Sequence, residues 1–354
     1  MMRHPIDTNQ HMRAAFDRLA SMDDITLLST LSDSLSDSSD LSSVVTAFRA
    51  LVREYPASSG TSTKTVNRVG IIAAHSVPTA YWPYLIYASL RGVPVKIKIP
   101  AENISHLHML ADLLVRGLST DNYDAFRPQW DISVKSGKEL LADGYWDDCE
   151  RLLVFGSNET VDTFRQHFSQ PHRVIGFGHL ESILLVDGIS LQTDERWLID
   201  LLTFGHIGCL APRLVVSVDG QKPDRIAEVM LSTLNGSVCP DLGRAITLRN
   251  LLNEMRVAGI NVWSSNDGMW LISANGNLPS KSIAGHLSIV SAPEILTSDT
   301  AIGALSCLPH HRQMLRNFAE LSALASWKCA WGMAQFPSMR WINGGCTVPE
   351  TLSV

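Results

Sequence analysis

Short apolar runs typical of strands alternate with longer amphipathic runs along most of the chain. In the first half, strand-type runs occupy residues 68–74, 93–99, 151–156, 172–177 and 182–187. Runs with a helical period separate several of them, at residues 79–90, 106–118 and 159–168. Strands that alternate with helices of about 10–15 residues are typical of βαβ units, so the pattern predicts an α/β fold with parallel sheets.

The alternation continues in the second half of the chain. A helix-type run from Asp194 precedes a strand-type run from Leu214. Further strands are expected at residues 260–265, 269–274 and 286–290, and further helices at residues 223–234, 247–257 and 311–327. Ahead of the first strand, residues 12–55 indicate helical pieces, and the Ser- and Thr-rich residues 56–65 indicate a solvated linker. This organisation predicts one α/β domain up to residue 194, a second over residues 195–328, and a tail over residues 329–354 that packs back.

Composition narrows the class of protein. The chain has 354 residues, 45% of them hydrophobic and 18% charged, with a formal net charge of −6. This balance is ordinary for a globular protein and gives no electrostatic reason to bind nucleic acid or an anionic membrane. The most apolar run, residues 69–90, carries His75, Pro78 and Pro83, so it does not indicate a membrane span. The six cysteines form no C-x-x-C pair and no disulfide framework, which favours a reducing cytoplasm.

Several familiar site motifs are absent from the sequence or incomplete. Gly176 and Gly178 lack the third glycine of a dinucleotide fingerprint, and a strand follows them where a helix would begin. No P-loop and no G-x-S-x-G elbow occurs. The histidine pairs 106/108 and 310/311 have no neighbouring carboxylate or cysteine with metal-ligand spacing, so we predict no metal site.

Cys209 is the strongest candidate for covalent chemistry. It lies in a turn of small residues between the predicted helix from Asp194 and the strand from Leu214. A helix end and exposed backbone amides can stabilise a thiolate, which is the nucleophilic form of cysteine. The alternative is a buried structural cysteine, because free cysteine is among the most buried residue types.

The chain resembles the aldehyde dehydrogenase superfamily, and within it the acyl-CoA reductases typified by the long-chain fatty acyl reductase of bacterial bioluminescence (LuxC type). Five segments carry the likeness in the family's order, at residues 71–102, 152–168, 174–187, 204–216 and, more weakly, 327–345. The resemblance implies an aldehyde dehydrogenase-like fold with two Rossmann-like α/β domains. The domain over residues 1–194 would bind a nicotinamide cofactor, and the domain over residues 195–328 would carry the nucleophile. The tail would then pack back near the active site.

The resemblance also assigns roles to individual residues. Cys209 falls at the acyl-accepting cysteine of the family. Lys98 falls at the lysine that contacts the adenosine ribose of the cofactor, with a solvent-facing strand residue as the alternative. Gly156, Ser157 and Glu159 fall on the loop and helix start beside that cofactor, where free amides would meet a phosphate.

Two departures from the family pattern affect the expected chemistry. Ser76 stands near the position of the oxyanion-holding asparagine, and His75 adjoins it, so both are candidate catalytic residues. Phe177 stands near the position of the glutamate that activates water in hydrolytic aldehyde dehydrogenases, while Glu181 is off register. A site without a water-activating base favours thiol exchange and reduction over hydrolysis.

The implied activity is reduction of an acyl thioester, on CoA or an acyl carrier protein, to the aldehyde through an acyl-enzyme on Cys209. NADPH is the expected cofactor, with NADH possible; we expect His179 and Trp341 to line the site, with a structural role as the alternative for His179. A homo-oligomer and an acyl-transferring partner enzyme are also expected. The alternatives are a semialdehyde or acyl-phosphate reductase of the same fold, or a partner-dependent or non-catalytic member, which Ser76 favours.

Overall fold

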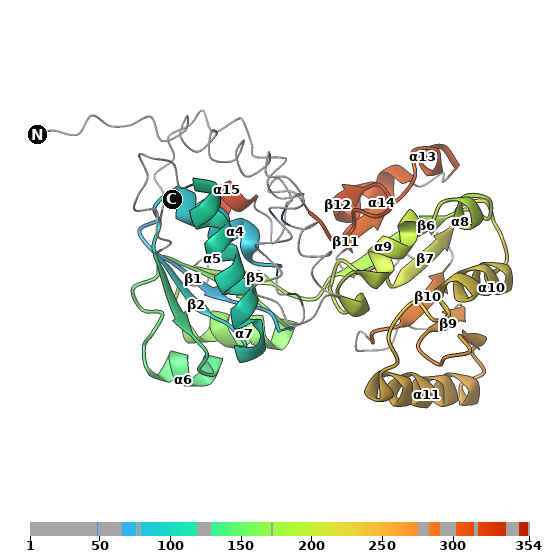
Figure 1. Cartoon of the computed structure of the whole chain (residues 1–354), viewed down its shortest axis with the longest axis horizontal. Helices are drawn as coiled ribbons and strands as arrows, with labels where there is room; N and C mark the ends of the chain where they lie inside the picture. Colours follow the sequence, from blue (N-terminus) through green and yellow to red (C-terminus); the bar gives the residue numbers. More distant parts are fainter. Residues whose placement is uncertain are drawn as a thin grey trace, which may run out of the picture. The chain divides into compact units, whose positions relative to one another are not determined.

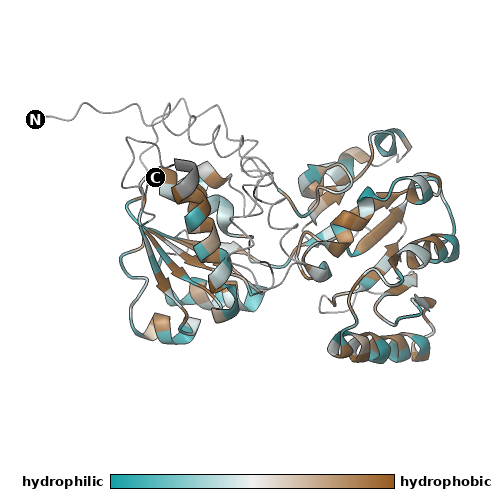
Figure 2. Ribbon diagram, viewed as in Figure 1, coloured by the Kyte–Doolittle hydropathy of each residue, from teal (hydrophilic) through white to brown (hydrophobic). Residues whose placement is uncertain are grey.

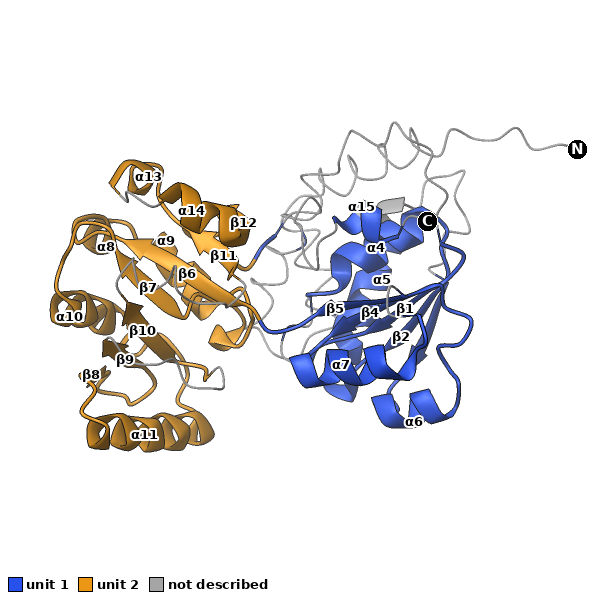
Figure 3. Cartoon of the chain, turned by 180° about the vertical axis from the view of Figure 1, so that it is seen from behind, with its two compact units in different colours: residues 1–179, 336–354 blue, residues 180–335 orange. Residues whose placement is uncertain are grey.

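The computed structural model describes residues 48, 66–75, 77, 79–118, 129–170, 173–274, 283–290, 302–314, 318–337 and 347–352. The chain divides into two compact units, residues 1–179 with 336–354 (unit 1) and residues 180–335 (unit 2) (Figure 3). Ser76, Trp341 and nearly all of the helical pieces predicted over residues 12–55 lie outside the described residues.

Unit 1 is built on a five-stranded parallel sheet with the strand order β3-β2-β1-β4-β5 (Figure 1). Its strands are β1 (Val69–Ile72), β2 (Val95–Lys98), β3 (Trp130–Ser133), β4 (Arg151–Phe155) and β5 (Val174–Phe177). Its helices are α4 (Trp82–Leu90), the 3-10 turn η1 (Ala101–Asn103), α5 (Ile104–Leu118), α6 (Gly137–Ala142), α7 (Asn158–His167) and α15 (Val348–Thr351).

Two hydrophobic clusters cover the two faces of this sheet. One joins α4 and α5 to alternate strand residues such as Ile71 and Leu153, and the other joins α6 and α7 to their neighbours Ile72 and Leu152. Successive strand side chains point to opposite faces, so each strand contributes to both clusters. The sheet is therefore doubly wound, and its strand order reverses between β1 and β4, where open α/β sheets bind ligands.

Unit 2 is built on a seven-stranded sheet with the order β12-β11-β6-β7-β10-β9-β8, parallel except for the antiparallel pair β8–β9. Its strands are β6 (Glu181–Val186), β7 (Leu214–Ser217), β8 (Val262–Ser264), β9 (Leu271–Ala274), β10 (His286–Val290), β11 (Ile302–Ser306) and β12 (Ala325–Cys329). Its helices are α8 (Ser190–Thr193), α9 (Arg196–Leu202), η3 (Thr203–His206), α10 (Pro223–Leu234), α11 (Leu242–Val257), α13 (His311–Met314) and α14 (Phe318–Leu324). Figure 2 shows hydrophobic residues concentrated on the strands, whereas α11 carries a mixture of hydrophilic and hydrophobic residues.

Most predicted elements are confirmed, and one helix is wrong at its end. The helix predicted over residues 311–327 gives way to β12, whose Ala325 pairs with Ile302 of β11. Backbone pairing at a sheet edge overrides a local pattern that reads as helical. The strands β3 and β11 and the helix α6 were not predicted. Of these, β3 is a short edge strand whose residues are largely exposed, which leaves it without a clear hydrophobic pattern.

The boundary between the units falls before residue 180, whereas the sequence places a domain boundary after residue 194. Strand β6 belongs to unit 2 because it pairs with β7, with Ile183 opposite Leu214. The described end of the chain returns to unit 1, where the amide of Val66 donates to the carbonyl of Leu352 at 3.2 Å. In the described part of the chain, no helix has the length and apolarity that a membrane crossing requires.

Candidate functional site

Cys209 lies on a strained turn in unit 2. Helix α9 ends at Leu202, and the next turn places Phe204, Gly205 and His206 in left-handed backbone conformation, with φ of 51°, 62° and 65°. Glycine adopts this region freely, but each non-glycine residue there costs on the order of 1 kcal/mol. Such a conformation persists only where the surroundings hold it, so the contacts of this turn decide how Cys209 is presented.

The buried side chain of His206 holds the turn through hydrogen bonds of both ring nitrogens. Its side chain is fully buried; Nε2 donates to the carbonyl of Pro212 at 2.9 Å, and Nδ1 accepts from the amide of Gly285 at 3.0 Å. Burial, with a smaller contribution from the cation of Arg213, lowers the pKa of His206 to about 3. The imidazole is therefore neutral and structural at physiological pH.

Two buried or half-buried arginines hold the carbonyls of the same turn. Nη2 of Arg213 donates to the carbonyls of His206 and Ile207, both at 3.3 Å. Nη1 of Arg244 donates to the carbonyl of Gly205 at 3.2 Å, and its guanidinium lies 4.7 Å from the ring centre of Trp270. The turn that leads to Cys209 is thus fixed on three successive carbonyls.

Cys209 itself is half-buried, and its backbone is tied to the sheet. Its carbonyl accepts from Oγ of Ser182 at 3.0 Å, and that oxygen accepts from the amide of Ala304 at 2.9 Å. Burial raises the pKa of the Cys209 thiol to about 11, against the opposing effect of the nearby Arg213 cation. The resting thiol is therefore protonated at neutral pH.

The other described cysteines have different surroundings. Cys149, Cys307 and Cys329 are buried, and Cys239 is exposed. Among the described cysteines, Cys209 is the one of intermediate exposure, and it follows the turn whose carbonyls Arg213 holds. Reactive cysteines are found in such partly exposed positions near positive charge.

Several site residues predicted from the sequence lie at one edge of the sheet in unit 1: the cofactor candidates Lys98, Gly156 and Ser157, the catalytic candidate His75 and the site-lining candidate His179. His75 follows β1, Lys98 ends β2, Gly156 and Ser157 follow β4, and His179 follows β5. The carboxyl ends of parallel strands meet at one edge, and β1 and β4 are the neighbours at which strand order reverses. The structure therefore places these residues at the carboxyl edge of one sheet, and their roles stay a prediction.

The start of α7 forms the centre of this edge. Oγ of Ser157 caps the helix by accepting from the amide of Thr160 at 3.2 Å. A Cβ on Gly156 would lie 3.2 Å from Thr160, so glycine keeps the loop close to the helix. Glu159 is exposed in the first helical turn, where a carboxylate also stabilises the helix itself.

Side chains that the sequence did not single out complete the edge. Oδ1 of Asn158 accepts from the amide of exposed His179 at 3.0 Å, which joins the turn after β5 to α7. The buried amide of Asn103 donates to the carbonyl of His75 at 3.0 Å, and the His75 side chain contacts the carboxylate of Glu102. No short-range motif distinguishes Asn158 or Asn103 from other asparagines at helix starts.

Lys98 and Lys96 occupy the same strand but have different surroundings. Nζ of Lys96 lies 2.9 Å from a carboxylate oxygen of Asp148 and donates to the carbonyl of Tyr145 at 2.8 Å. Lys98 is half-buried at the end of β2, and among the described residues it forms no ion pair. Lys98 is thus the lysine of this strand that lies at the carboxyl edge of the sheet.

Phe177, which stands near the family position of the water-activating glutamate, packs among other aromatic residues. Phe177 stacks on Phe155 with ring centres 4.3 Å apart, and Tyr84 packs against both rings. Glu181 is buried in β6 of unit 2; burial lowers the pKa of Arg213, and the charge of Glu181 opposes that shift. Phe177 carries no group that could act as a general base.

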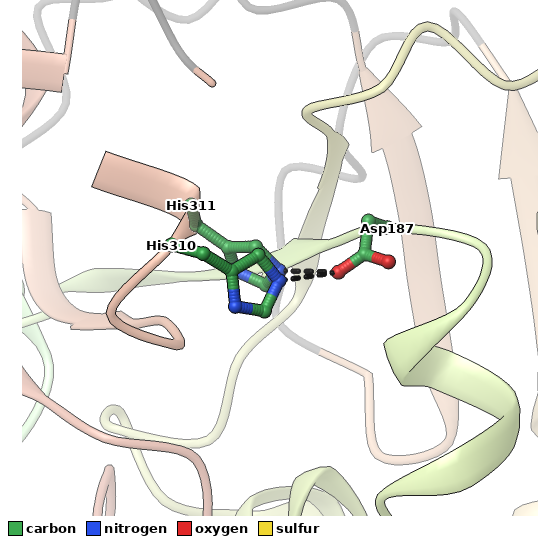
Figure 4. A group of neighbouring side chains, drawn as sticks. All are labelled: Asp187, His310 and His311. Atoms are coloured by element: carbon green, nitrogen blue, oxygen red, sulfur yellow. Dashed lines mark hydrogen bonds and ion pairs between the residues drawn. The ribbon is translucent and has the colours of Figure 1, made fainter. Parts of the chain in front are cut away.

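The structure corrects the interpretation of His310 and His311 as histidines without a carboxylate neighbour. Oδ2 of Asp187, which follows β6, lies 3.0 Å from Nε2 of His310 and 2.8 Å from Nε2 of His311 (Figure 4). The parallel strands β6 and β11 bring these distant residues to one sheet edge. Oδ1 of Asp187 also accepts from the amide of Ser190 at 2.9 Å.

This group has the residue types of a metal site, but its hydrogen bonds fix another role for His311. Nδ1 of His311 accepts from the amide of Leu308 at 3.2 Å, so the proton of the neutral ring lies on Nε2. Burial lowers the pKa of His311, which keeps the ring neutral. A protonated Nε2 donates to Asp187 and has no lone pair for a metal, so the group is a hydrogen-bonded brace.

Comparison with known proteins establishes the fold. No family model and no curated protein sequence matches the chain. Aldehyde dehydrogenase from Bacillus cereus, solved with NAD+, is 14% identical with a TM-score of 0.66, over 99% of this chain and 83% of that one. Aldehyde dehydrogenase from Bartonella henselae is 13% identical with a TM-score of 0.65, over 99% and 86% of the two chains. A variant of aldehyde dehydrogenase C from Pseudomonas syringae, with NAD+ and octanal, is 13% identical with a TM-score of 0.65, over 97% and 80%. The chain therefore has the aldehyde dehydrogenase-like α/β fold that its sequence predicts.

Proposed function

We propose that this chain is a nicotinamide-dependent oxidoreductase that reduces an acyl thioester to an aldehyde through an acyl-enzyme on Cys209. The observation that carries the proposal is the placement of this thiol in an aldehyde dehydrogenase-like fold. Cys209 is half-buried on a strained turn between α9 and β7, with its backbone fixed by Ser182. Active sites retain strained turns of this kind where the surrounding hydrogen bonds hold them in place.

The edge of unit 1 fits a dinucleotide. Gly156 leaves the loop before α7 without a side chain, and the helix start presents amides to a phosphate. Lys98 would bind the ribose hydroxyls from the end of β2, and Glu159 would contact the cofactor from the first turn of α7. Reduced nicotinamide, when bound, supplies the hydride for the reaction. NADPH is the cofactor we expect, and NADH is the second arm of the assay.

The covalent steps belong to Cys209. Its thiolate attacks the thioester carbonyl, the S–C bond to the enzyme forms, and the carrier thiol leaves with the proton. Hydride delivery to this acyl carbon and one proton from solvent convert the acyl-enzyme to a thiohemiacetal. Collapse breaks the S–C bond, releases the aldehyde and returns the thiol. Dividing the reduction into two transfers is the advantage of a covalent route.

The lack of a glutamate near position 177 favours reduction over hydrolysis. Phe177 stands near the family position of the water-activating glutamate, and a phenyl ring cannot activate water. An acyl-enzyme without such a base favours hydride transfer over hydrolysis. The same argument disfavours the opposite reaction, oxidation of an aldehyde to a free acid, although aldehyde dehydrogenases share this fold.

A second candidate is a form that needs a partner protein or has lost turnover. The raised pKa of the Cys209 thiol, about 11, favours it, because little thiolate exists at neutral pH without a further charge. An acyl-transferring partner enzyme or a second copy of the chain would supply that charge or reshape the turn. This candidate predicts no reaction of the chain alone.

Turnover with defined substrates separates these possibilities. Acyl-CoA of several lengths, acyl carrier protein conjugates, an acyl phosphate and a semialdehyde are each mixed with NADPH or NADH, or with the oxidised forms. We expect oxidation of reduced cofactor with a thioester, and one aldehyde for each cofactor consumed. Reaction only with the acyl phosphate or only with the semialdehyde would replace the thioester assignment. Aldehyde oxidation to free acid at a higher rate than thioester reduction would contradict the proposal.

A further inference from the structure

We propose that Arg213 is a positioning residue for Cys209, which holds the turn before the thiol and supplies the positive charge that favours its thiolate. The inference deepens the proposed function and takes its catalytic meaning from it. It concerns a residue to which neither the sequence nor the fold comparison assigns a role. Its geometry in unit 2 carries the argument.

The backbone of Arg213 is locked next to the first residue of β7. Its amide donates to the carbonyl of Ser182 at 3.0 Å, and its carbonyl accepts from the amide of Ser288 at 2.8 Å. The residue is therefore paired to the strands on both sides, since Ser182 lies on β6 and Ser288 on β10. A side chain that starts from so fixed a point has little freedom to leave the turn.

The side chain turns back toward the nucleophile segment and is 6% exposed. Nη2 spans the carbonyls of His206 and Ile207 at 3.3 Å each. Nη1 is buried and has no hydrogen-bond partner among the described residues. Carbonyls accept hydrogen bonds but carry no full charge, so the guanidinium remains a buried cation beside the turn.

The other ionisable groups near this turn do not replace that charge. Burial keeps His206 and His286 neutral, since it lowers their pKa values to about 3 and about 4. Arg244 contacts the turn through Gly205, but its charge does not act on the thiol as that of Arg213 does. Glu181 is the carboxylate whose charge opposes that of Arg213.

Substitutions at positions 213 and 181 distinguish the effect of the Arg213 charge from the effect of its side-chain volume and hydrogen bonds. Methionine at position 213 keeps much of the volume and removes both the charge and the hydrogen bonds. Lysine keeps the charge but not the planar fork that spans two carbonyls. Glu181→Gln leaves Arg213 in place and removes the opposing carboxylate. The last change acts on the thiol in the opposite direction, so the proposal does not depend on one variant that could fail to fold.

The test measures the pH dependence of alkylation of Cys209 by iodoacetamide in the full chain, read by peptide mass spectrometry. Exposed Cys239 is the reference thiol in every sample. We expect Arg213→Met to slow alkylation of Cys209 at neutral pH about tenfold, as a pKa rise of about one unit requires. Arg213→Lys should recover most of the rate, Glu181→Gln should raise it, and the control Arg225→Met, at an exposed arginine of α10, should leave the pH profile unchanged.

The outcomes test the charge role of Arg213 independently of the proposed reduction. An unchanged profile in folded Arg213→Met, or an equal slowing in Arg213→Lys and Arg213→Met, overturns the charge role. If Arg213→Met does not fold, an unchanged profile in Glu181→Gln overturns it. No thioester and no cofactor is present, so this result is independent of whether the proposed reduction occurs. Retained wild-type circular dichroism defines which variants are scored as folded.

Discussion

Removal of the Ser182 hydroxyl is expected to release the Cys209 turn from the sheet. Ser182 is fully buried, and its Oγ joins the carbonyl of Cys209 at 3.0 Å to the amide of Ala304 at 2.9 Å. Ser182→Ala leaves both backbone groups without this partner. A buried group left unsatisfied costs about 1–3 kcal/mol, so the pair costs about 2–4 kcal/mol when partial relaxation is allowed. A Cβ on Gly303 would lie 3.1 Å from this oxygen, which shows how closely the strand packs on it.

The assay combines stability with the rate of reaction at the thiol. Urea unfolding followed by tryptophan fluorescence gives the free energy of unfolding, and single-turnover mixing with an acyl-CoA gives the rate of acylation of Cys209. Ser326→Ala is the matched control, because Ser326 donates to the carbonyl of Gly303 at 2.9 Å on the same strand β11 but does not contact the turn. We expect both variants to lose stability and only Ser182→Ala to lose acylation rate. Equal acylation rates in wild type and Ser182→Ala would refute the idea that this hydrogen bond presents the nucleophile.

Other predictions concern the thiol, the cofactor edge and the oxyanion. The pKa of about 11 at Cys209 means that its alkylation rate should rise about tenfold per pH unit from pH 7 to pH 10. A plateau of the Cys209 rate below pH 9, in the wild-type chain, would disprove the effect of burial. Lys98→Ala and Glu159→Ala should each weaken nicotinamide binding, measured by fluorescence titration, more than they slow acylation; unchanged affinity in both would place the cofactor elsewhere. Ser76→Ala should slow acylation by less than the roughly 10²-fold loss of a dominant oxyanion donor, and Ser76→Asn should be tolerated, whereas equal single-turnover rates in all three proteins would make Ser76 a turn residue only.

The elements most accessible from the sequence are those whose local signals agree with their packing. Helix α10 begins at Pro223 and ends at Leu234 as predicted, because proline suits the first turn and one face of the helix is apolar and buried. Strand β10, at residues 286–290, is likewise found where it is predicted. The loop ends of β2 and β4 could also be predicted, since parallel strands bring Lys98 and Gly156 to one edge.

The missed features depend on contacts between distant parts of the chain. The residues 325–327 read as helical by their spacing, but pairing with β11 makes them a strand. Asp187 and His310 are 123 positions apart, so their hydrogen bond has no signature in either local segment. The left-handed conformations of Phe204 and His206 were also not predicted, because non-glycine residues rarely adopt that region and the buried contacts of the turn impose it here.

The central claim is that Cys209 accepts the acyl group, and mass measurement of the protein without nicotinamide tests it most directly. The chain is incubated with a panel of acyl thioesters, its intact mass is recorded, and the modified peptide is sequenced. The proposal predicts one acyl adduct on Cys209, lost in Cys209→Ala and retained in the control Cys239→Ala. An adduct on Cys149 or Cys239 while Cys209 stays free would contradict it, as would the absence of any adduct with every thioester in the panel.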